Sequence, residues 1–236
     1  MSSDRLGVVL AAMEGVNGDH ARSAIDRVCA AGVVLLSLRG AGVSLIVDGE
    51  LRGTAGVSDS GIGVVQELQL TLGEGPCVDA WRSGTVVLEP DLAEPEVVRW
   101  PALAQAGVSA GVLAVFAFPL QIGAIRIGVL VLYRDHPGPL SGDELAYGLV
   151  LADVAAQVIL GLQAGAAADT LHELLASEPP HWAEIHQATG MLAVQLGVGL
   201  DEAFVRLRAR AFADGRPLRL LAREVVDGDL RLEHSR

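Results

Sequence analysis

The feature that most constrains the fold is an almost entirely apolar stretch, GVLAVFAFPLQIGAIRIGVLVLY (111–133). A run of this length is sufficient for one membrane-spanning helix. Pro119, Gln121 and Arg126 interrupt it, however, and each half has the length of a β-strand. We therefore predict two buried strands joined by a turn at QIGA (121–124), and no membrane span.

Short segments upstream of this stretch suit β-hairpins, because apolar or alternating residues are separated by glycine and Asp-Gly turn signals. They are VVLLSLRG (33–40), GVSLIVDG (42–49) and LRGTAGVS (51–58). A helix before them is indicated by Ile25, Val28 and Cys29, which recur at helical spacing, with Asp19 as its expected N-cap.

Two more helices flank the predicted strands. SGIGVVQELQLTLGEGP (60–76) is expected to be a helix that ends at Gly73 and Gly75, before Pro76. Ser141 and Glu144 form a capping box that opens a helix to about residue 162. Strands in the middle and helices at both ends predict an α+β domain with an antiparallel sheet over residues 1–163.

Residues 164–180 shift to small and polar types and end in two prolines, which indicates a helical extension and a linker. Beyond it, residues 181–236 have a purely helical pattern in three short segments, the third beginning with Pro217. Their expected core faces are Trp182, Ile185, Thr189, Leu192 and Leu196; Ala203, Phe204, Leu207 and Ala211; and Leu218, Leu221, Ala222 and Val225. Because short helices with tight connections share one small core, we predict a compact three-helix domain.

The acidic charge of the chain is confined to its first part. The net charge is −12, which argues against a general binder of nucleic acid or anionic membranes. Residues 1–180 contain 9 arginines and 21 acidic residues, whereas residues 181–236 contain 8 of each. The chain has no lysine, which excludes a Walker-type phosphate-binding lysine, a Schiff-base enzyme and the lysine of a phospho-receiver domain.

Catalysis finds little support in the sequence. His181 and His186 are five residues apart, which does not match the HExxH spacing, and GEGPC (73–77) lacks the ending of a phosphate-binding loop. Cys29 and Cys77 have no ligand-like spacing and fit a reducing compartment. The N-terminus lacks the features of a signal peptide. We therefore expect a cytoplasmic protein that is not an enzyme and holds no metal.

The arginines of the last quarter form the one basic patch of the chain. They are Arg206, Arg208, Arg210, Arg216, Arg219 and Arg223, and Asp214 is the one acidic residue between 206 and 223. Ordinary solvated helix faces would explain them, with Glu202 and Arg206 as a weak i, i+4 pair. Arginine is also the side chain best suited to bidentate phosphate contacts and to stacking on unpaired bases. An RNA-binding surface is therefore the competing interpretation.

Residues 185–226 resemble an ANTAR domain, a three-helix RNA-binding antiterminator module. The resemblance lies in A-x-G-[MI]-L at Ala188 to Leu192, E-A-F at Glu202 to Phe204, L-R at Leu207 and Arg208, and R-P-L followed by A-x-x-V-V at 216–226. Upstream, the α+β pattern with LGEGPCVDAW and PLQIGAIRIGVLVLYR over about residues 15–163 resembles the GAF sensor domain that often precedes ANTAR in bacterial regulators.

The resemblance implies a signal-responsive transcription antitermination regulator, in which a signal sensed by the GAF domain changes the dimerisation or exposure of ANTAR. ANTAR then binds paired hairpin loops of nascent RNA, whose unpaired bases are accessible. The implied RNA-binding residues are Thr189, Arg206, Arg208, Arg210, Arg216, Arg219 and Arg223. Thr189 stands where the family commonly has lysine, and its neighbours Ala188 and Gly190 are small enough to let another helix approach closely.

The GAF-like part gives no signature of a particular cofactor. The apolar strands around 112–118 and 127–132, with the GEGPC turn, would line a small-molecule pocket or simply form core, and core is the preferred interpretation. A homodimer is expected from the apolar helices that flank the sheet.

Two alternatives remain at this stage. The first is a ligand sensor whose C-terminal helices serve only protein interaction or dimerisation, which the acidity and Thr189 favour. The second is a helix-turn-helix DNA binder, although no polar recognition helix is evident.

Overall fold

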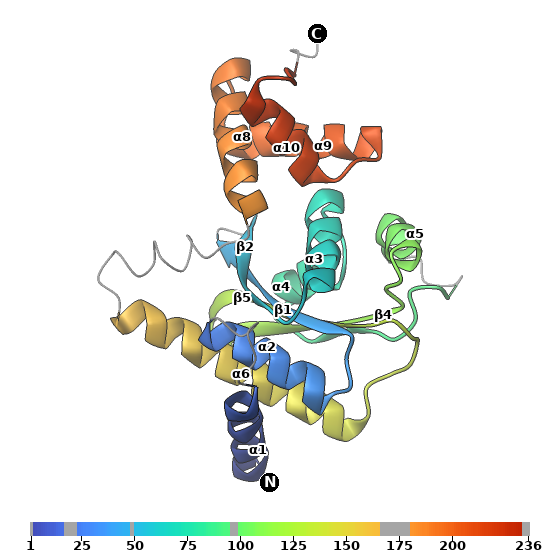
Figure 1. Ribbon diagram of the computed structural model, residues 1–236, viewed down its shortest axis with the longest axis vertical. Helices are drawn as coiled ribbons and strands as arrows, with labels where there is room; N and C mark the ends of the chain where they lie inside the picture. Colours follow the sequence, from blue (N-terminus) through green and yellow to red (C-terminus); the bar gives the residue numbers. More distant parts are fainter. Residues whose placement is uncertain (1, 17–22, 48–49, 95–98, 166–179, 233–236) are drawn as a thin grey trace.

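The computed structural model describes residues 2–16, 23–47, 50–94, 99–165 and 180–232. Five strands form one antiparallel sheet in the order β2-β1-β5-β4-β3 (Figure 1). The strands are β1 (Gly40–Val47), β2 (Glu50–Val57), β3 (Val87–Glu89), β4 (Ala114–Ile122) and β5 (Ile125–Arg134). The predicted α+β class with an antiparallel sheet is confirmed.

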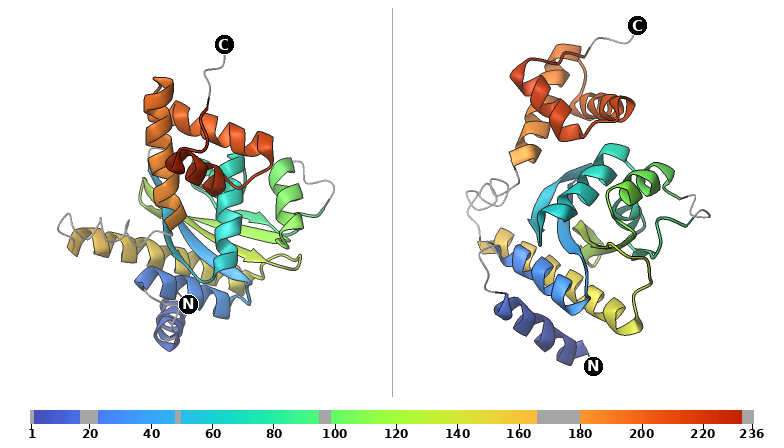
Figure 2. Two further views of the ribbon diagram at one scale, coloured as in Figure 1. Left: turned by 45° about the horizontal axis from the view of Figure 1, so that its top comes forward. Right: turned by 45° about the vertical axis from the view of Figure 1, so that its right-hand side comes forward.

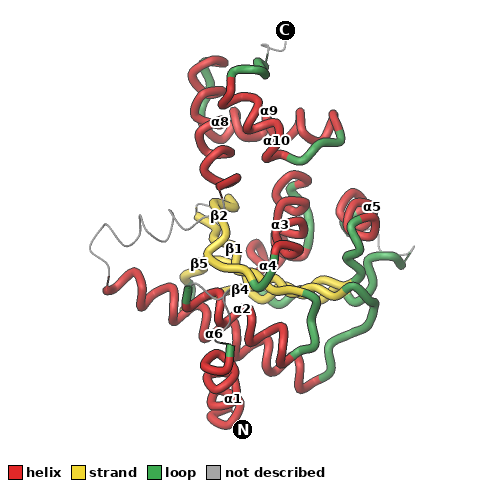
Figure 3. Tube along the Cα trace, viewed as in Figure 1, coloured by secondary structure: helices red, strands yellow, loops and turns green. Residues whose placement is uncertain are grey.

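Helices cover both faces of this sheet (Figure 2). One side carries α1 (Ser2–Gly15), α2 (Ala24–Leu35) and α6 (Gly142–Gly165). The other side carries α3 (Ser60–Leu72), α4 (Pro76–Ser83) and α5 (Pro101–Ser109). The C-terminal domain consists of α8 (Pro180–Leu196), α9 (Leu200–Asp214) and α10 (Leu218–Asp227), and it lies beyond the outer end of α3 (Figure 3).

The long apolar stretch is a hairpin at the centre of the sheet, as predicted. β4 pairs with β5 from Ala114↔Arg134 to Ile122↔Ile125, and Gly123 takes the positive φ of 59° that the tight turn requires. Alternate side chains of both strands enter two different cores, one beneath α2 and α6 and one beneath α3, α4 and α5. Because both faces are covered, the strands read as continuous apolar runs and not as alternating ones.

Two predictions upstream of the hairpin were wrong. The segment 33–40 is not a strand, because residues 33–35 continue α2 and β1 begins only at Gly40; a short apolar run fits a buried helix end as well as a strand. The N-cap of α2 is Ser23, whose hydroxyl accepts from the Asp26 N–H while the Asp26 carboxylate accepts from the Ser23 N–H. Asp19 lies outside the described residues.

The GEGPC turn connects α3 to α4 and also supports α5. α3 ends at Gly73 in the left-handed conformation, as predicted, and Gly75 is the N-cap of α4. Between them, Glu74 Oε1 accepts hydrogen bonds from the backbone N–H groups of Ala102 and Leu103 at 2.9 and 3.0 Å. The carboxylate thus satisfies two donors in the first turn of α5.

The predicted capping box opens α6, since Ser141 and Glu144 exchange side-chain to backbone hydrogen bonds. By length and composition, α6 is apolar enough to cross a membrane. One side of it packs on the sheet, where Leu151 and Ala155 are fully buried, while Leu149 and Asp153 on other sides are exposed.

The three C-terminal helices form one small core, as predicted from their apolar spacing. Its buried residues include Ile185, Ala188, Leu192, Leu196, Ala203, Leu207, Ala211, Leu218, Leu221, Ala222 and Val225. Phe204 is half-buried and packs against the edge of this core. Pro217 is the N-cap of α10 and not its first residue. The side chain of Trp182 and most of the expected linker, residues 166–179, lie outside the described residues.

Candidate nucleic-acid interface

The six predicted arginines lie on α9, on α10 and on the connection between them. Arg206, Arg208 and Arg210 belong to α9, Arg219 and Arg223 belong to α10, and Arg216 precedes α10. The structure therefore brings them together in one part of the C-terminal domain. Five of them form ion pairs with acidic residues, and their partners determine how available each guanidinium is.

The pairs on α9 are local. Arg206 bonds to Glu202, and Arg210 Nε lies 2.7 Å from Asp214 Oδ2, both at i, i+4 spacing. Such exposed pairs contribute about 0.3–0.5 kcal/mol each. Their guanidinium groups are therefore free to exchange a carboxylate for a phosphate at little cost.

The pairs around α10 follow the same pattern. Arg216 donates two hydrogen bonds to the Glu224 carboxylate, and these bonds lower the pKa of Glu224 below its ordinary value. Arg223 Nε lies 3.8 Å from Asp227 Oδ2. Both acidic partners follow the last arginine of the 206–223 window. The net positive charge around these arginines is therefore smaller in the folded domain than the charge count over residues 206–223 suggests.

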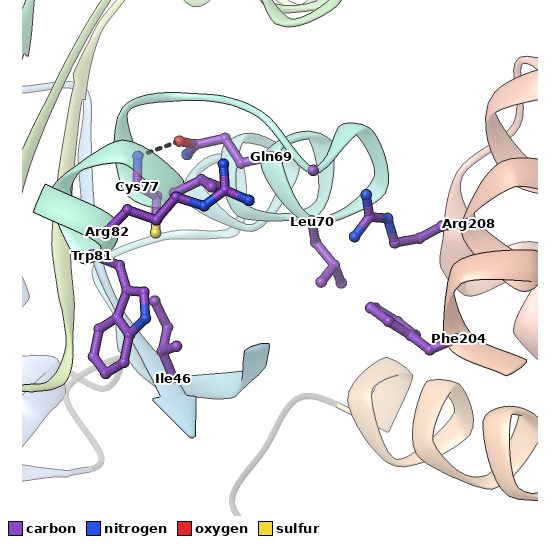
Figure 4. Close-up of a pocket in the computed structure, with 10 residues that line it drawn as sticks. Ile46, Gln69, Leu70, Cys77, Trp81, Arg82, Phe204 and Arg208 are labelled. Carbon is purple, nitrogen blue, oxygen red and sulfur yellow. Dashed lines mark hydrogen bonds between the residues drawn. The ribbon is translucent and has the colours of Figure 1, made fainter. Parts of the chain in front are cut away.

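Two of the arginines contact the N-terminal domain. The Arg219 N–H and Nε donate to the two oxygens of Glu67 at 3.2 and 3.1 Å, and Glu67 lies on α3. The Arg208 guanidinium points at the C-terminal end of α3, beside Leu70, and its carbon is 5.7 Å from the centre of the Phe204 ring (Figure 4). An added Cβ on Gly73 would lie 1.9 Å from Arg208 Nη2, so the guanidinium sits directly on this helix end.

Sequence reasoning did not identify this inter-domain contact. Glu67, Leu70 and Gly73 are 3 residues apart from one to the next, so they share one face of α3. Leu70 is only 4% exposed and is buried with the core of the C-terminal domain. No local pattern signals a partner that lies 152 residues away, as Arg219 does from Glu67.

Thr189 differs from the other predicted RNA-binding residues. Its side chain is buried at 8% exposure, and its Oγ1 donates a 2.7 Å hydrogen bond to the Ile185 carbonyl within α8. A hydroxyl held in this way faces the core of the domain. Gly190 also differs from expectation, because a Cβ built on it would meet nothing within 4 Å. Close helix packing therefore does not explain this glycine, which corrects the earlier interpretation.

The interior of the N-terminal domain is packed with side chains. The predicted strand residues around 112–118 and 127–132 are mostly core, as preferred from the sequence. A buried polar chain links the sheet to α3: Gln66 Nε2 donates to Ser44 Oγ at 2.8 Å, and Thr54 Oγ1 donates to Gln66 Oε1 at 3.2 Å. Burial raises the pKa of the Cys77 thiol to about 12.

Cavities occur where the two domains meet. A small one of about 130 Å³ is lined by residues that include Gln69, Cys77, Phe204 and Arg208 (Figure 4). A larger one of about 530 Å³ lies between α3, α5, α9 and the start of α10, and its walls include Leu68, Leu72 and Phe212. Both belong partly to the N-terminal and partly to the C-terminal domain.

Comparison with known proteins assigns both parts. The chain matches the GAF domain family over residues 20–160 and the ANTAR domain family over residues 180–226. The search of the curated proteins found no match.

Among solved structures, the chain is similar to the GAF domain of a phosphoenolpyruvate-protein phosphotransferase from Coxiella burnetii, with 16% identity and a TM-score of 0.50, over 70% of this chain and 97% of that chain. A GAF domain from the corresponding Acinetobacter protein gives the same identity and TM-score over 70% of this chain and 96% of that one. At this identity the likeness shows the fold alone.

The fold and the family matches define a sensor domain joined to a helical output domain. The chain belongs to the GAF domain family and carries an ANTAR domain after it. It is thus a signal-sensing regulator with an RNA-binding output domain.

Proposed function

We propose that this protein is a cytoplasmic, non-enzymatic transcription antitermination regulator that binds hairpin loops of nascent RNA through α9 and α10. The observation that carries the proposal is the gathering of Arg206, Arg210, Arg216, Arg219 and Arg223 on one small domain, each in an ion pair that leaves its guanidinium partly exposed. Arginines of this kind can exchange a weak carboxylate partner for RNA phosphates and stack on unpaired bases.

Thr189 is given no direct RNA contact in this proposal, because its hydroxyl is committed to the Ile185 carbonyl. A homodimer fits a target with two hairpins, and the exposed apolar residues Leu6 and Leu10 on α1 and Leu149 on α6 offer a surface for it. A small molecule is the proposed signal.

The direct experiment is a selection followed by a mobility-shift measurement. The full chain is used to select from a library of two-hairpin RNAs with randomised loops, and the selected RNA is compared with a loop-scrambled version and with duplex DNA. We expect binding to the selected RNA to be at least about 10-fold tighter than to either control, since loop recognition reads unpaired bases. Equal affinity for the scrambled RNA would refute loop recognition.

A charge-removal pair tests the surface itself. The double variant Arg206→Gln/Arg210→Gln is expected to weaken RNA binding by about 10-fold and to reduce the salt dependence of the affinity, because two phosphate contacts are lost. The matched control is Arg39→Gln/Arg231→Gln, which removes the same charge elsewhere. Equal losses in both double variants would show a nonspecific charge effect. A lower unfolding midpoint in the first variant alone would show a structural role instead.

The second candidate function is a sensor whose C-terminal helices serve protein interaction or dimerisation. It is favoured by large apolar side chains on this domain, with Val194 86% and Phe212 60% exposed. The selection separates the two functions. A protein-interaction domain enriches no RNA, and Val194→Asp then reduces self-association measured by sedimentation.

A further inference from the structure

The N-terminus of α10 holds a carboxylate that comes from the sensor domain. α10 begins at Leu218, so the Arg219 N–H is among the first-turn donors that lack a partner within the helix. This N–H donates to Glu67 Oε1, and Arg219 Nε donates to Glu67 Oε2. The backbone and the side chain of Arg219 thus bind both oxygens of the Glu67 carboxylate, which belongs to the other domain.

The same donor set suits a phosphate group. A helix N-terminus carries partial positive charge and free N–H groups, and a guanidinium adds a full charge with directional donors. We propose that Arg219 and the N-terminus of α10 form a phosphate-binding site for the RNA backbone, and that Glu67 occupies this site while the two domains are docked. The inference rests on the proposed RNA-binding function, and it makes the sensor domain and RNA competitors for one site.

The rest of the α3 face explains how Glu67 is brought there. Leu70 inserts its side chain into the core of the output domain, and the end of α3 at Gly73 receives the Arg208 guanidinium (Figure 4). A cation at a helix C-terminus is favourable because the last carbonyl groups carry partial negative charge. Glu67, Leu70 and Gly73 therefore dock α3 through one ion pair, one apolar anchor and one helix-end contact. In the docked state this helix contacts two of the six predicted RNA-binding arginines.

The docking is weak enough to be reversed. Arg219 keeps 45% of its side chain exposed, so water and salt screen its ion pair with Glu67. A cavity of about 530 Å³ lies between α3, α5 and α9 beside the ion pair, so the two domains are not closely packed at this place. On its wall, the buried Thr71 Oγ1 has no hydrogen-bond partner within the described part of the chain. An RNA that offers several phosphates can therefore displace a single carboxylate.

The test compares Glu67→Gln with Glu14→Gln in the full chain. Both variants remove one sensor carboxylate, but Glu14 lies on α1, on the opposite side of the sheet (Figure 1). The probe is a labelled two-hairpin RNA that both the wild-type chain and Glu67→Gln select. We expect Glu67→Gln to bind it about 3- to 5-fold tighter, since less of the protein is held in the closed state. Glu14→Gln is expected to stay within about twofold of wild type.

A second substitution locates the phosphate. Adding Arg219→Gln to Glu67→Gln is expected to reverse the gain in affinity and to lower the slope of log affinity against log salt by about one. Hydrogen exchange without RNA gives a separate readout: Glu67→Gln is expected to exchange faster than wild type in the first turn of α10 and along α3.

The outcomes distinguish the two proposals. If RNA binds wild type and Glu67→Gln equally, or binds Glu67→Gln more weakly, competition at Arg219 is refuted while RNA binding stands. If the salt slope does not change on adding Arg219→Gln, the phosphate site is refuted. If neither the wild-type chain nor Glu67→Gln selects any RNA, the proposed function fails and this inference falls with it, even where exchange shows that the domains have separated.

Discussion

Neutralising Glu144 should destabilise the sensor domain far more than neutralising its neighbour Asp143. Glu144 closes the capping box of α6 and pairs with Arg134, whose side chain is only 7% exposed. Arg134 also donates to the Leu36 carbonyl at 3.0 Å, so its guanidinium is fixed in the interior. Glutamine keeps one acceptor oxygen, which can serve the capping box, but it replaces the oxygen that accepts from Arg134 with an NH2 donor. Glu144→Gln therefore removes both the charge and the hydrogen bond that the Arg134 guanidinium makes to this side chain.

The size of the effect follows from burial. Leaving a fully buried charge without its partner costs about 3–5 kcal/mol. Because the Glu144 side chain is 25% exposed, water can reach the site and we expect a loss of about 2 kcal/mol. Asp143 also pairs with an arginine, at 2.7 Å from Arg5, but its side chain is 82% exposed. Asp143→Asn should therefore cost less than about 0.5 kcal/mol.

The difference should depend on pH in one direction. Burial alone would raise the pKa of Glu144, but hydrogen bonds from Ser141 and the Arg134 ion pair outweigh it and hold the pKa below the ordinary 4.5. A carboxyl with a lowered folded-state pKa stabilises the fold above its unfolded pKa and loses this effect as the pH falls through the folded value. The advantage of wild type over Glu144→Gln should thus be complete near about pH 7 and shrink below about pH 4.

Urea unfolding at both pH values measures this advantage. Tryptophan fluorescence reports mainly the sensor domain, because two of the three tryptophans, Trp81 and Trp100, belong to it and Trp100 is 2% exposed. Losses of equal size in Glu144→Gln and Asp143→Asn, or an advantage that persists unchanged at low pH, would refute the argument from the buried guanidinium.

Two further predictions concern the interior. Gly190→Ala should stabilise the output domain by about 0.5–1 kcal/mol, because Gly190 lies within α8 and an added Cβ meets nothing within 4 Å; a lower urea midpoint would contradict this. Burial raises the pKa of the Cys77 thiol to about 12 and that of the Cys29 thiol further still. Both thiols should therefore resist a maleimide near about pH 7.5 and react only in urea. Rapid labelling of the native chain, detected by mass spectrometry, would show that a thiol is accessible.

The sequence predicted the elements whose signals are local. Gly123 and its neighbours mark the turn of the β4–β5 hairpin, and Ser141 with Glu144 marks the start of α6, because turn and cap chemistry involves residues only a few positions apart. The segment 33–40 misled because short apolar runs do not distinguish a helix end from a strand. The helical spacing of Phe204 predicted its contact with the core of the output domain, but it did not show that the ring also borders the sensor domain.

The candidate site was likewise predictable only where its signals are local. The identity of its arginines was evident from composition, but their ion-pair partners were not. Glu202 and Glu224 lie outside the basic window and still neutralise it in space. Glu67 is on another domain, and its contact with Arg219 depends on how two folded units dock, which no periodicity encodes.

The docking surface and the sensor interior belong to the same helix. Gln66 of α3 is hydrogen-bonded to Ser44 on β1 and to Thr54 on β2. Glu67 is the next residue and Leu70 lies one turn further on, and both contact the output domain. Because packed interiors transmit a displacement instead of absorbing it, α3 cannot move against the sheet without moving the carboxylate that Arg219 holds. The hydrogen bonds of Gln66 inside the sensor domain and the ion pair of Glu67 with the output domain are close together because both belong to one helix of 13 residues. The ion pair contributes about 1 kcal/mol, and a change of 1.4 kcal/mol alters an equilibrium tenfold. Loss of the Glu67–Arg219 pair would therefore shift the equilibrium between docked and separated domains several-fold.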